Sequence, residues 1–321
     1  MGIAKNKGPS LSICIPSYQS ERWIRTAIES ALAQVLPVAE ILVSDDHSQD
    51  GTFDIVDQYR AVSGVRVVRQ SERLGLGRHY RFLIENARAD YICILSADDA
   101  LFPTFSQTML GALADEENTG MVAGGWLECN GALNPLRARG LNLPRQDLNP
   151  PEGFRVFSKG CTYIISASVL SRKLLLQTAP LPPEAALPTD WYWGLMLGLH
   201  SKLKFIRQPV AYYRFHEANA SHSNAARWRQ AAEAMILFVQ ARLDTTEGIR
   251  LEETLRKLRT SPQPDSNITG EMESRNLATT VKDLLKSLIA LRYRRLPKFI
   301  SMAESGKSVI LDELNRGKHS P

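Results

Sequence analysis

Two pairs of adjacent carboxylates are the residues most capable of chemistry. Asp45–Asp46 and Asp98–Asp99 each follow a short apolar run, 40–44 and 91–95, that predicts a buried strand. In open parallel sheets, ligands bind just beyond the carboxyl ends of the strands. Two adjacent ionised carboxylates are unfavourable unless positive charge lies nearby. A single pair is explained equally well by a divalent metal site or by a helix cap.

The elements that would position these pairs alternate along the first hundred residues. Strands are expected at 11–15, 40–44, 65–69 and 91–95, with amphipathic helices between them. This order predicts an α/β fold, with a mostly parallel sheet flanked by helices on both faces. Two acidic strand ends and a Pro-Ser-Tyr loop after the first strand then indicate one polar cleft. Such a cleft suits a nucleotide diphosphate with Mg²⁺ or Mn²⁺.

Length and composition are those of an ordinary globular protein. The 321 residues predict about two domains, or one large domain with an appendage, and the chain is 44% hydrophobic and 23% charged. The net charge of +5 suits an anionic ligand or membrane surface. Four cysteines without CxxC spacing, no signal-peptide pattern and no apolar run of about 18 residues favour a reduced, cytoplasmic protein.

Five segments in order carry a resemblance to a known family. They are SICIPSYQSERWI, ILVSDDHSQDGT, ERLGLGRHYRFLIENARADYICILSADD, PTDWYWGL and YYRFHEANAS, within residues 11 to about 221. This stretch resembles the family-two glycosyltransferases of the GT-A fold. The resemblance implies transfer of a sugar from a nucleotide sugar, a UDP-sugar first of all, to an acceptor hydroxyl. It also implies a divalent metal, inversion at the anomeric carbon, and a place in bacterial polysaccharide or lipopolysaccharide biosynthesis.

The resemblance also implies residue roles on the donor side. The nucleotide pocket would be lined by Pro16, Ser17, Tyr18 and Glu21. Asp45 and Asp46 would hold the base, since a carboxylate accepts well from the ring N–H of uracil. Asp98 would contact the ribose, and Asp98 and Asp99 would coordinate the cation. His216 matches a position near the metal and the diphosphate.

The chain departs from the family pattern at several positions. Ser96 stands where the acidic motif often begins with a further Asp, and Arg73 replaces an Asn. The usual pocket arginine has no clean match, so Arg78 and Arg81 both remain candidates. These departures bear on the donor sugar and the metal geometry.

Asp190 matches the family's general base. A carboxylate must take the proton of an acceptor hydroxyl during attack, and the neighbouring tryptophans would keep Asp190 partly buried. The alternative is a helix N-cap before WYWGLMLGL, and one residue can fill both roles. His216 likewise has the alternative of an ordinary polar residue at a strand end.

The acceptor side is less regular. Residues 124–153 show no period and are expected to form a long loop, either an acceptor lid or a structureless insertion. As a lid it would offer Arg137, Arg139 and Arg145 to an anionic acceptor.

The expected domains are a catalytic domain at 1–222 and a helical C-terminal extension at 223–321. The catalytic domain divides into a nucleotide-binding half, 10–120, and an acceptor half, 121–222. The extension carries one amphipathic helix from about Trp228 and a second at 277–291, followed by a basic cluster at 292–298. The cluster fits peripheral binding to the inner face of a membrane that holds a lipid-linked acceptor. The other interpretation is a helical subdomain, packed on the catalytic domain or forming a homodimer.

Two other functions share some of these features. A nucleotidyltransferase has the same alternating architecture and acidic metal site, but PSYQSERW stands where its Gly-rich phosphate loop is expected. A non-catalytic nucleotide-sugar-binding protein with a decayed site would explain Ser96, but not the retention of Asp98, Asp99 and Asp190. The expected acceptor is a saccharide or a lipid-linked sugar, and no nucleic-acid partner is expected.

Overall fold

The structure is a computed structural model that describes residues 8–113, 118–181, 188–216, 225–243, 251–252, 254 and 256–257. Its first half alternates strands and helices: β1 Leu11–Ser17, α1 Ile24–Leu32, β2 Glu40–Asp45, α2 Thr52–Asp57, β3 Val65–Arg69, α3 Leu76–Asn86 and β4 Tyr91–Ile94. The second half holds β5 Ala100–Leu101, α4 Phe105–Gly111, β6 Thr119–Cys129, β7 Pro135–Arg139, α5 Glu152–Phe157, β8 Ser168–Ser171, α6 Arg172–Thr178, α7 Thr189–His200, β9 Lys202–Arg214 and α8 Ala225–Gln240.

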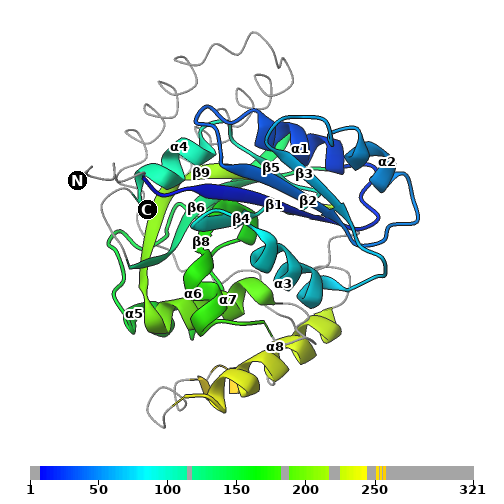
Figure 1. Cartoon of the computed structure of the whole chain (residues 1–321). Helices are drawn as coiled ribbons and strands as arrows, with labels where there is room; N and C mark the ends of the chain where they lie inside the picture. Colours follow the sequence, from blue (N-terminus) through cyan, green and yellow to red (C-terminus); the bar gives the residue numbers. More distant parts are fainter. Residues whose placement is uncertain are drawn as a thin grey trace, which may run out of the picture.

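One nine-stranded sheet runs through both expected halves of the catalytic domain. Its order is β3-β2-β1-β4-β8-β6-β9-β5, with β7 added at β6. The pairings among β1 to β4 are all parallel, as predicted. Beyond β4 the sheet is mixed, because β8 pairs antiparallel with both β4 and β6. The expectation of an α/β fold with helices on both faces is confirmed (Figure 1).

Side-chain alternation along the strands builds a core on each face of the sheet. In β1, Ile13 and Ile15 pack toward α1 and α4, while Cys14 packs toward α3 and α7. Every one of these positions is fully buried. The short apolar runs of the sequence are therefore strands covered on both faces.

The expectation of a long loop at 124–153 is wrong for residues 124–129 and 135–139, which lie in strands, whereas residues 140–151 form a loop with a single β-bridge at Leu148. Residues 119–139 form a hairpin in which Trp126 pairs with Arg139. A Cβ on Gly125 would lie 2.6 Å from the Arg139 carbonyl oxygen, and one on Gly124 would lie 2.5 Å from Val210. The glycines that indicated a loop thus permit the close approach of neighbouring strands.

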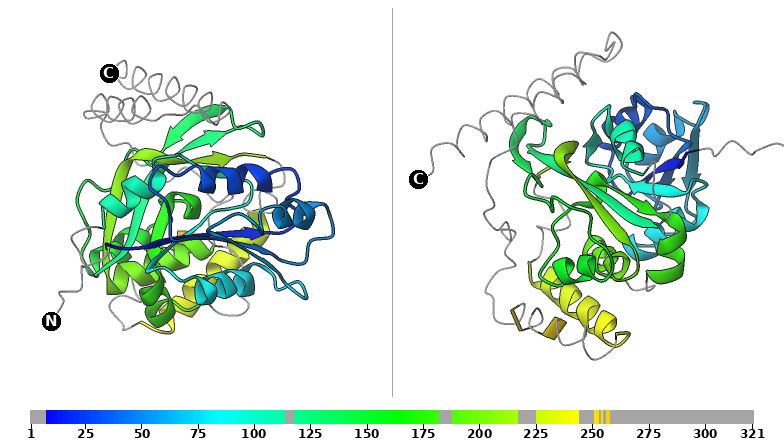
Figure 2. Two further views of the ribbon diagram at one scale, coloured as in Figure 1. Left: turned by 45° about the horizontal axis from the view of Figure 1, so that its top comes forward. Right: turned by 90° about the vertical axis from the view of Figure 1, so that its left-hand side faces the viewer.

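The first expected C-terminal helix is α8, which lies against α7 on the side away from β1 (Figure 2). Its Ala232, Ile236 and Val239 are buried, and Phe238 meets Tyr192 of α7 edge to face. The second expected helix and the basic cluster at 292–298 lie outside the described residues. Among the helices that are described, none is long and apolar enough to cross a membrane.

Candidate active site

The turn that follows β4 brings Asp98 to the end of β9. After β4 the chain crosses to β5, which pairs antiparallel with β9 through Ala100 and Tyr212. Asp98 therefore meets His216, two residues beyond β9, with 3.0 Å between Asp98 Oδ2 and His216 Nε2. The sequence predicted both as parts of one metal site, and the fold brings them together.

Asp99 points the other way, into the protein. Its carboxylate accepts a hydrogen bond of 2.6 Å from Ser166 Oγ and one of 2.9 Å from the Arg214 backbone N–H. Burial, and then the neighbouring charge of Asp98, raise the pKa of Asp99 well above its usual range. A role for Asp99 in metal binding stays a prediction, since both oxygens already have protein donors.

Ser96, at the position of a further Asp in the family, belongs to the same hydrogen-bond network. Its backbone N–H donates to Ser166 Oγ at 3.2 Å, and the same hydroxyl donates to Asp99. The Asp99 N–H in turn donates to the Ser96 carbonyl oxygen at 3.1 Å. The backbone of Ser96 thus holds the acidic turn in shape, whatever its side chain contributes.

Asp190 lies in the first turn of α7. Its Oδ1 accepts from the Trp191 N–H at 2.8 Å, and the thiol of Cys161 donates to the carboxyl group. Burial raises the pKa of Asp190, and these two donors lower it by less. A carboxyl whose pKa is raised toward the working pH is suited to accept a proton.

Tyr80 of α3 is influenced by the charges of both Asp190 and the Asp98–Asp99 pair. Burial raises the pKa of its phenol, and the charges of Asp190, Asp98 and Asp99 raise it further. All three carboxylates therefore lie within electrostatic reach of one hydroxyl. The Tyr80 ring also stacks on Trp193 of α7, with 6.0 Å between ring centres, so α3 packs against the helix whose first turn carries Asp190.

The other predicted carboxylates, Asp45 and Asp46, lie at the end of β2. Asp45 is fully buried, and it accepts from the Ser48 hydroxyl at 2.5 Å and the Ser48 N–H at 3.0 Å. Asp46 accepts from the backbone N–H groups of Leu74 and Gly75, at 2.7 and 2.9 Å. Both carboxylates therefore shape the loops around the base end of the cleft, and their contact with a base stays a prediction.

The predicted pocket residues after β1 lie beside this region. Ser17 Oγ donates to the Ser44 carbonyl oxygen at 3.2 Å, half-buried Pro16 lies within β1, and half-buried Tyr18 directly follows the strand. Glu21 accepts from the Gly51 N–H at 3.1 Å.

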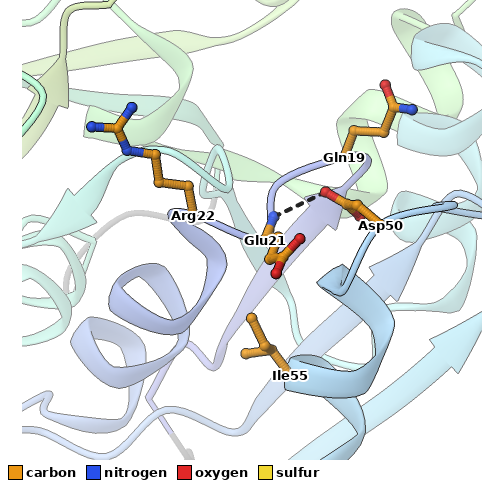
Figure 3. Close-up of a pocket in the computed structure, with 5 residues that line it drawn as sticks. All are labelled: Gln19, Glu21, Arg22, Asp50 and Ile55. Carbon is orange, nitrogen blue, oxygen red and sulfur yellow. Dashed lines mark hydrogen bonds between the residues drawn. The ribbon is translucent and has the colours of Figure 1, made fainter.

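Glu21 also lines a pocket of about 480 Å³ together with Gln19, Arg22, Asp50 and Ile55 (Figure 3). The Glu21 N–H donates to Asp50 across this pocket at 3.4 Å. The pocket is polar, because Glu21, Arg22 and Asp50 contribute charged side chains to its lining, and it lies beside the loop that follows β1.

The two arginines predicted for the nucleotide pocket are both exposed on α3. Arg78 Nε donates to the Leu74 carbonyl oxygen at 2.8 Å, and Arg81 pairs with Glu85 at 2.8 Å. Neither of these contacts reaches the Asp45–Asp46 pair, and both assignments stay predictions.

Trp23 and Arg214 were missed as site residues. The Trp23 ring stacks on His216 with 5.5 Å between ring centres, and the Arg214 guanidinium lies 4.3 Å from the same ring. Arg214 also donates from Nε to the Asp98 carbonyl oxygen at 2.6 Å. The sequence signal was present but read differently, because Trp23 also fits the helical spacing of α1.

Comparison with known proteins decides the family. The family model described as Glycosyl transferase family 2 matches residues 12–177, a little more than half of the chain. The chain belongs to glycosyl transferase family 2.

Relatives and solved structures agree with this membership. EpsH of Bacillus subtilis (strain 168) is 32% identical over 34% of this chain and 31% of its own. TuaG of the same organism, whose description connects it with teichuronic acid biosynthesis, is 34% identical over 29% of this chain and 38% of its own. The chain thus spans less than half the length of these relatives.

A crystal structure of S. aureus TarS residues 1–349 with UDP-GlcNAc superposes with a TM-score of 0.61. It covers 97% of this chain and 93% of TarS at 15% identity. At that identity the likeness shows the fold, so the GT-A-like architecture expected from the sequence is confirmed.

Proposed function

We propose that the chain transfers a sugar from a nucleotide sugar to an acceptor hydroxyl, with Asp190 as general base. The observation that carries the proposal is that the charges of Asp190, Asp98 and Asp99 all raise the pKa of one phenol, that of Tyr80. Asp190, with its raised pKa, is the carboxyl fitted to accept a proton. The pair of Asp98 and His216 would face the diphosphate.

The reaction is a single displacement with inversion. The acceptor oxygen attacks the anomeric carbon of the sugar while its proton passes to the Asp190 carboxylate. The bond between that carbon and the diphosphate oxygen breaks, and its electron pair leaves with the nucleotide diphosphate. The transition state has oxocarbenium-like character, as in glycoside hydrolysis. Trp191 and Trp193 are buried beside the base and would exclude water from it.

A divalent ion, Mn²⁺ or Mg²⁺, fits the pair of Asp98 and His216. A carboxylate oxygen and an imidazole nitrogen 3.0 Å apart are acceptable donors for such an ion. Within the described residues, no group of three or more His, Cys, Asp or Glu could hold a metal. The donor diphosphate and water would therefore complete the coordination, as is common for Mg²⁺. When bound, the ion would neutralise charge on the leaving diphosphate.

The proposed donor is a UDP-sugar. The TarS complex with UDP-GlcNAc supports this choice through the shared fold. Asp45 and Asp46 lie at the end of β2, where the base is proposed to bind. Their carboxylate oxygens are the kind of acceptor that a ring N–H of uracil requires.

The proposed acceptor is a growing saccharide or lipid-linked sugar in surface-polysaccharide assembly at the cytoplasmic face of a membrane. The description of TuaG supports a place in polysaccharide assembly. Membrane contact through the basic cluster at 292–298, or dimerisation through the C-terminal helices, is proposed from the sequence alone.

A panel of nucleotide sugars tests the proposal. Purified protein with Mn²⁺ and an acceptor extract should release UDP from one donor, and chelation with EDTA should stop the release. Release of pyrophosphate from a nucleoside triphosphate and a sugar phosphate would instead indicate a nucleotidyltransferase. Donor binding without any turnover would indicate a decayed site.

A further inference from the structure

The phenol of Tyr163 contacts the residue proposed as general base. Tyr163 lies in the segment between α5 and β8, and its hydroxyl donates a hydrogen bond of 2.7 Å to the backbone carbonyl oxygen of Asp190. Tyr163 is only 3% exposed. Burial raises the pKa of the phenol well above its usual range, so the hydroxyl keeps the proton that it donates. A buried hydrogen bond thus joins the segment before β8 to the first turn of α7.

The Tyr163 ring is itself held by packing. It meets the Phe157 ring edge to face, with 5.5 Å between ring centres. The backbone carbonyl oxygen of Phe157 accepts a hydrogen bond of 2.6 Å from Trp191 Nε1. The Phe157 ring also fills the space beside Gly194, where a Cβ would lie 2.8 Å from it. Phe157 therefore supports the phenol and the first half of α7 at the same time.

The first turn of α7 depends on such contacts from outside the helix. The preceding residue, Pro188, has no side-chain atom that could cap the helix by hydrogen bonding. Helix ends fray, and their backbone groups need partners beyond the helix. Asp190 Oδ1 accepts from the Trp191 N–H, but this bond lies within the turn and moves with it. The bond from Tyr163 comes from another segment, so it fixes the turn relative to the rest of the protein.

We propose that Tyr163 is a positioning residue for the general base. Its hydroxyl holds the backbone of Asp190, and thereby sets the direction from which the carboxylate meets the acceptor hydroxyl. The proposal rests on the proposed function and deepens it. Tyr163 transfers no proton, because its hydroxyl is bonded to the carbonyl oxygen of Asp190 rather than to the carboxylate. Displacement of a reacting group by about 1 Å can slow a reaction about 10²-fold, so a bond behind the base can govern the rate.

Tyr192 provides a matched comparison on the same helix. Its hydroxyl also donates to a backbone carbonyl oxygen, that of Pro180, at 3.0 Å, and the residue is 4% exposed. Residues two apart on a helix do not face each other, so Tyr192 and Asp190 lie on different sides of α7. The Tyr192 ring instead meets Phe238 of α8. The two phenols therefore match in burial and in type of bond, and only Tyr163 holds the base.

Kinetics of the full-length variants Tyr163→Phe and Tyr192→Phe test the proposal. Each variant keeps its ring and loses one buried hydrogen bond, so both should melt about 2–4 °C below wild type. UDP release, measured with Mn²⁺ and the donor and acceptor extract that wild type turns over, should show a kcat about 10- to 100-fold lower for Tyr163→Phe. For Tyr192→Phe, kcat should stay within about twofold of wild type. UDP binding by calorimetry should stay within about twofold for both, because neither hydroxyl contacts the donor.

A double variant separates positioning from a general structural role. Tyr163→Phe added to Asp190→Asn should lower the residual rate no further, because a positioning residue acts only through the group that it positions. Tyr192→Phe added to Asp190→Asn should likewise leave the residual rate unchanged.

Three outcomes would overturn the inference. They are wild-type kcat in Tyr163→Phe, an equal loss of kcat in Tyr192→Phe, and a further loss when Tyr163→Phe is added to Asp190→Asn. Failure of the proposed function looks different. Wild-type protein would then release no UDP from any donor, or Asp190→Asn would keep the full rate, and either result appears before any tyrosine variant is compared.

Discussion

Replacement of Asp190 by Asn removes the proposed base with little change in shape. An Asn carbonyl oxygen can still accept from the Trp191 N–H, which Asp190 does at 2.8 Å. The amide cannot take up a proton from the acceptor. General base catalysis contributes about 10²- to 10⁴-fold. We therefore expect kcat to fall by that factor, about 3–5 kcal/mol in barrier height, while UDP binding stays at the wild-type level.

The pH dependence of the wild-type enzyme should run in opposite directions for activity and stability. The base must be ionised, so kcat should fall as the pH falls through the raised pKa of Asp190. The folded pKa lies above the unfolded one, so the stabilising contribution of Asp190 is full below the unfolded pKa. It is lost as the pH rises through the folded pKa. Each unit of upward shift corresponds to about 1.4 kcal/mol. At neutral pH the Asn variant should thus melt no lower than wild type.

Three measurements on the same preparations decide the question: UDP release, UDP binding by calorimetry, and melting temperature over a pH series. Asp57→Asn is the matched control, because Asp57 is half-exposed and pairs with Arg60 within one turn. It should leave all three measurements unchanged. Wild-type kcat in Asp190→Asn would refute the base assignment. A large drop in its melting temperature would show instead that the carboxylate is structural.

Three further predictions follow from the same contacts. Cys161→Ala removes a donor that lowers the pKa of Asp190, so the acid limb of the kcat profile should move to higher pH. His216→Ala should raise by about tenfold or more the Mn²⁺ concentration that half-saturates UDP binding, measured by calorimetry. Gly198→Ala would place its Cβ 2.5 Å from neighbouring backbone and should destabilise the fold by about 1–3 kcal/mol, seen as a lower melting temperature. Gly131→Ala meets only an ordinary contact at 3.7 Å and should melt as wild type does.

The parallel half of the sheet was predictable because its signals are local. The run at 65–69 is β3 as expected, and β2 at Glu40–Asp45 extends the expected strand by one residue. Short apolar runs separated by amphipathic stretches indicate strands that are buried on both faces, even when the neighbouring strands are not known. The hairpin of β6 and β7 was missed because its evidence is non-local. Gly124 and Gly125 look like loop residues until Val210 and Arg139 are placed against them.

The acidic residues at the strand ends could be predicted from the sequence, but the cationic side chain that contacts them could not. Arg214 reaches the acidic turn from the end of β9, 116 residues along the chain from Asp98. Trp23 supports His216 from the start of α1. Trp23 directly precedes α1 and fits its helical spacing, so the local pattern reads as a core residue as readily as a site residue. These contacts exist only because parallel strands bring distant strand ends to one edge of the sheet.

The two Asp-Asp pairs first indicated a cation because adjacent ionised carboxylates repel one another. In the structure, the two side chains of each pair have different hydrogen-bond partners. Asp45 is bonded to Ser48, and Asp46 to the loop after β3. Repulsion within each pair is offset by these separate donors, so it no longer requires a metal at β2. At β4 the case for a metal rests instead on Asp98 and its contact with His216, because Asp99 is turned toward protein donors. One pair thus shapes the end of the cleft assigned to the base, and one member of the other pair is left to face the diphosphate.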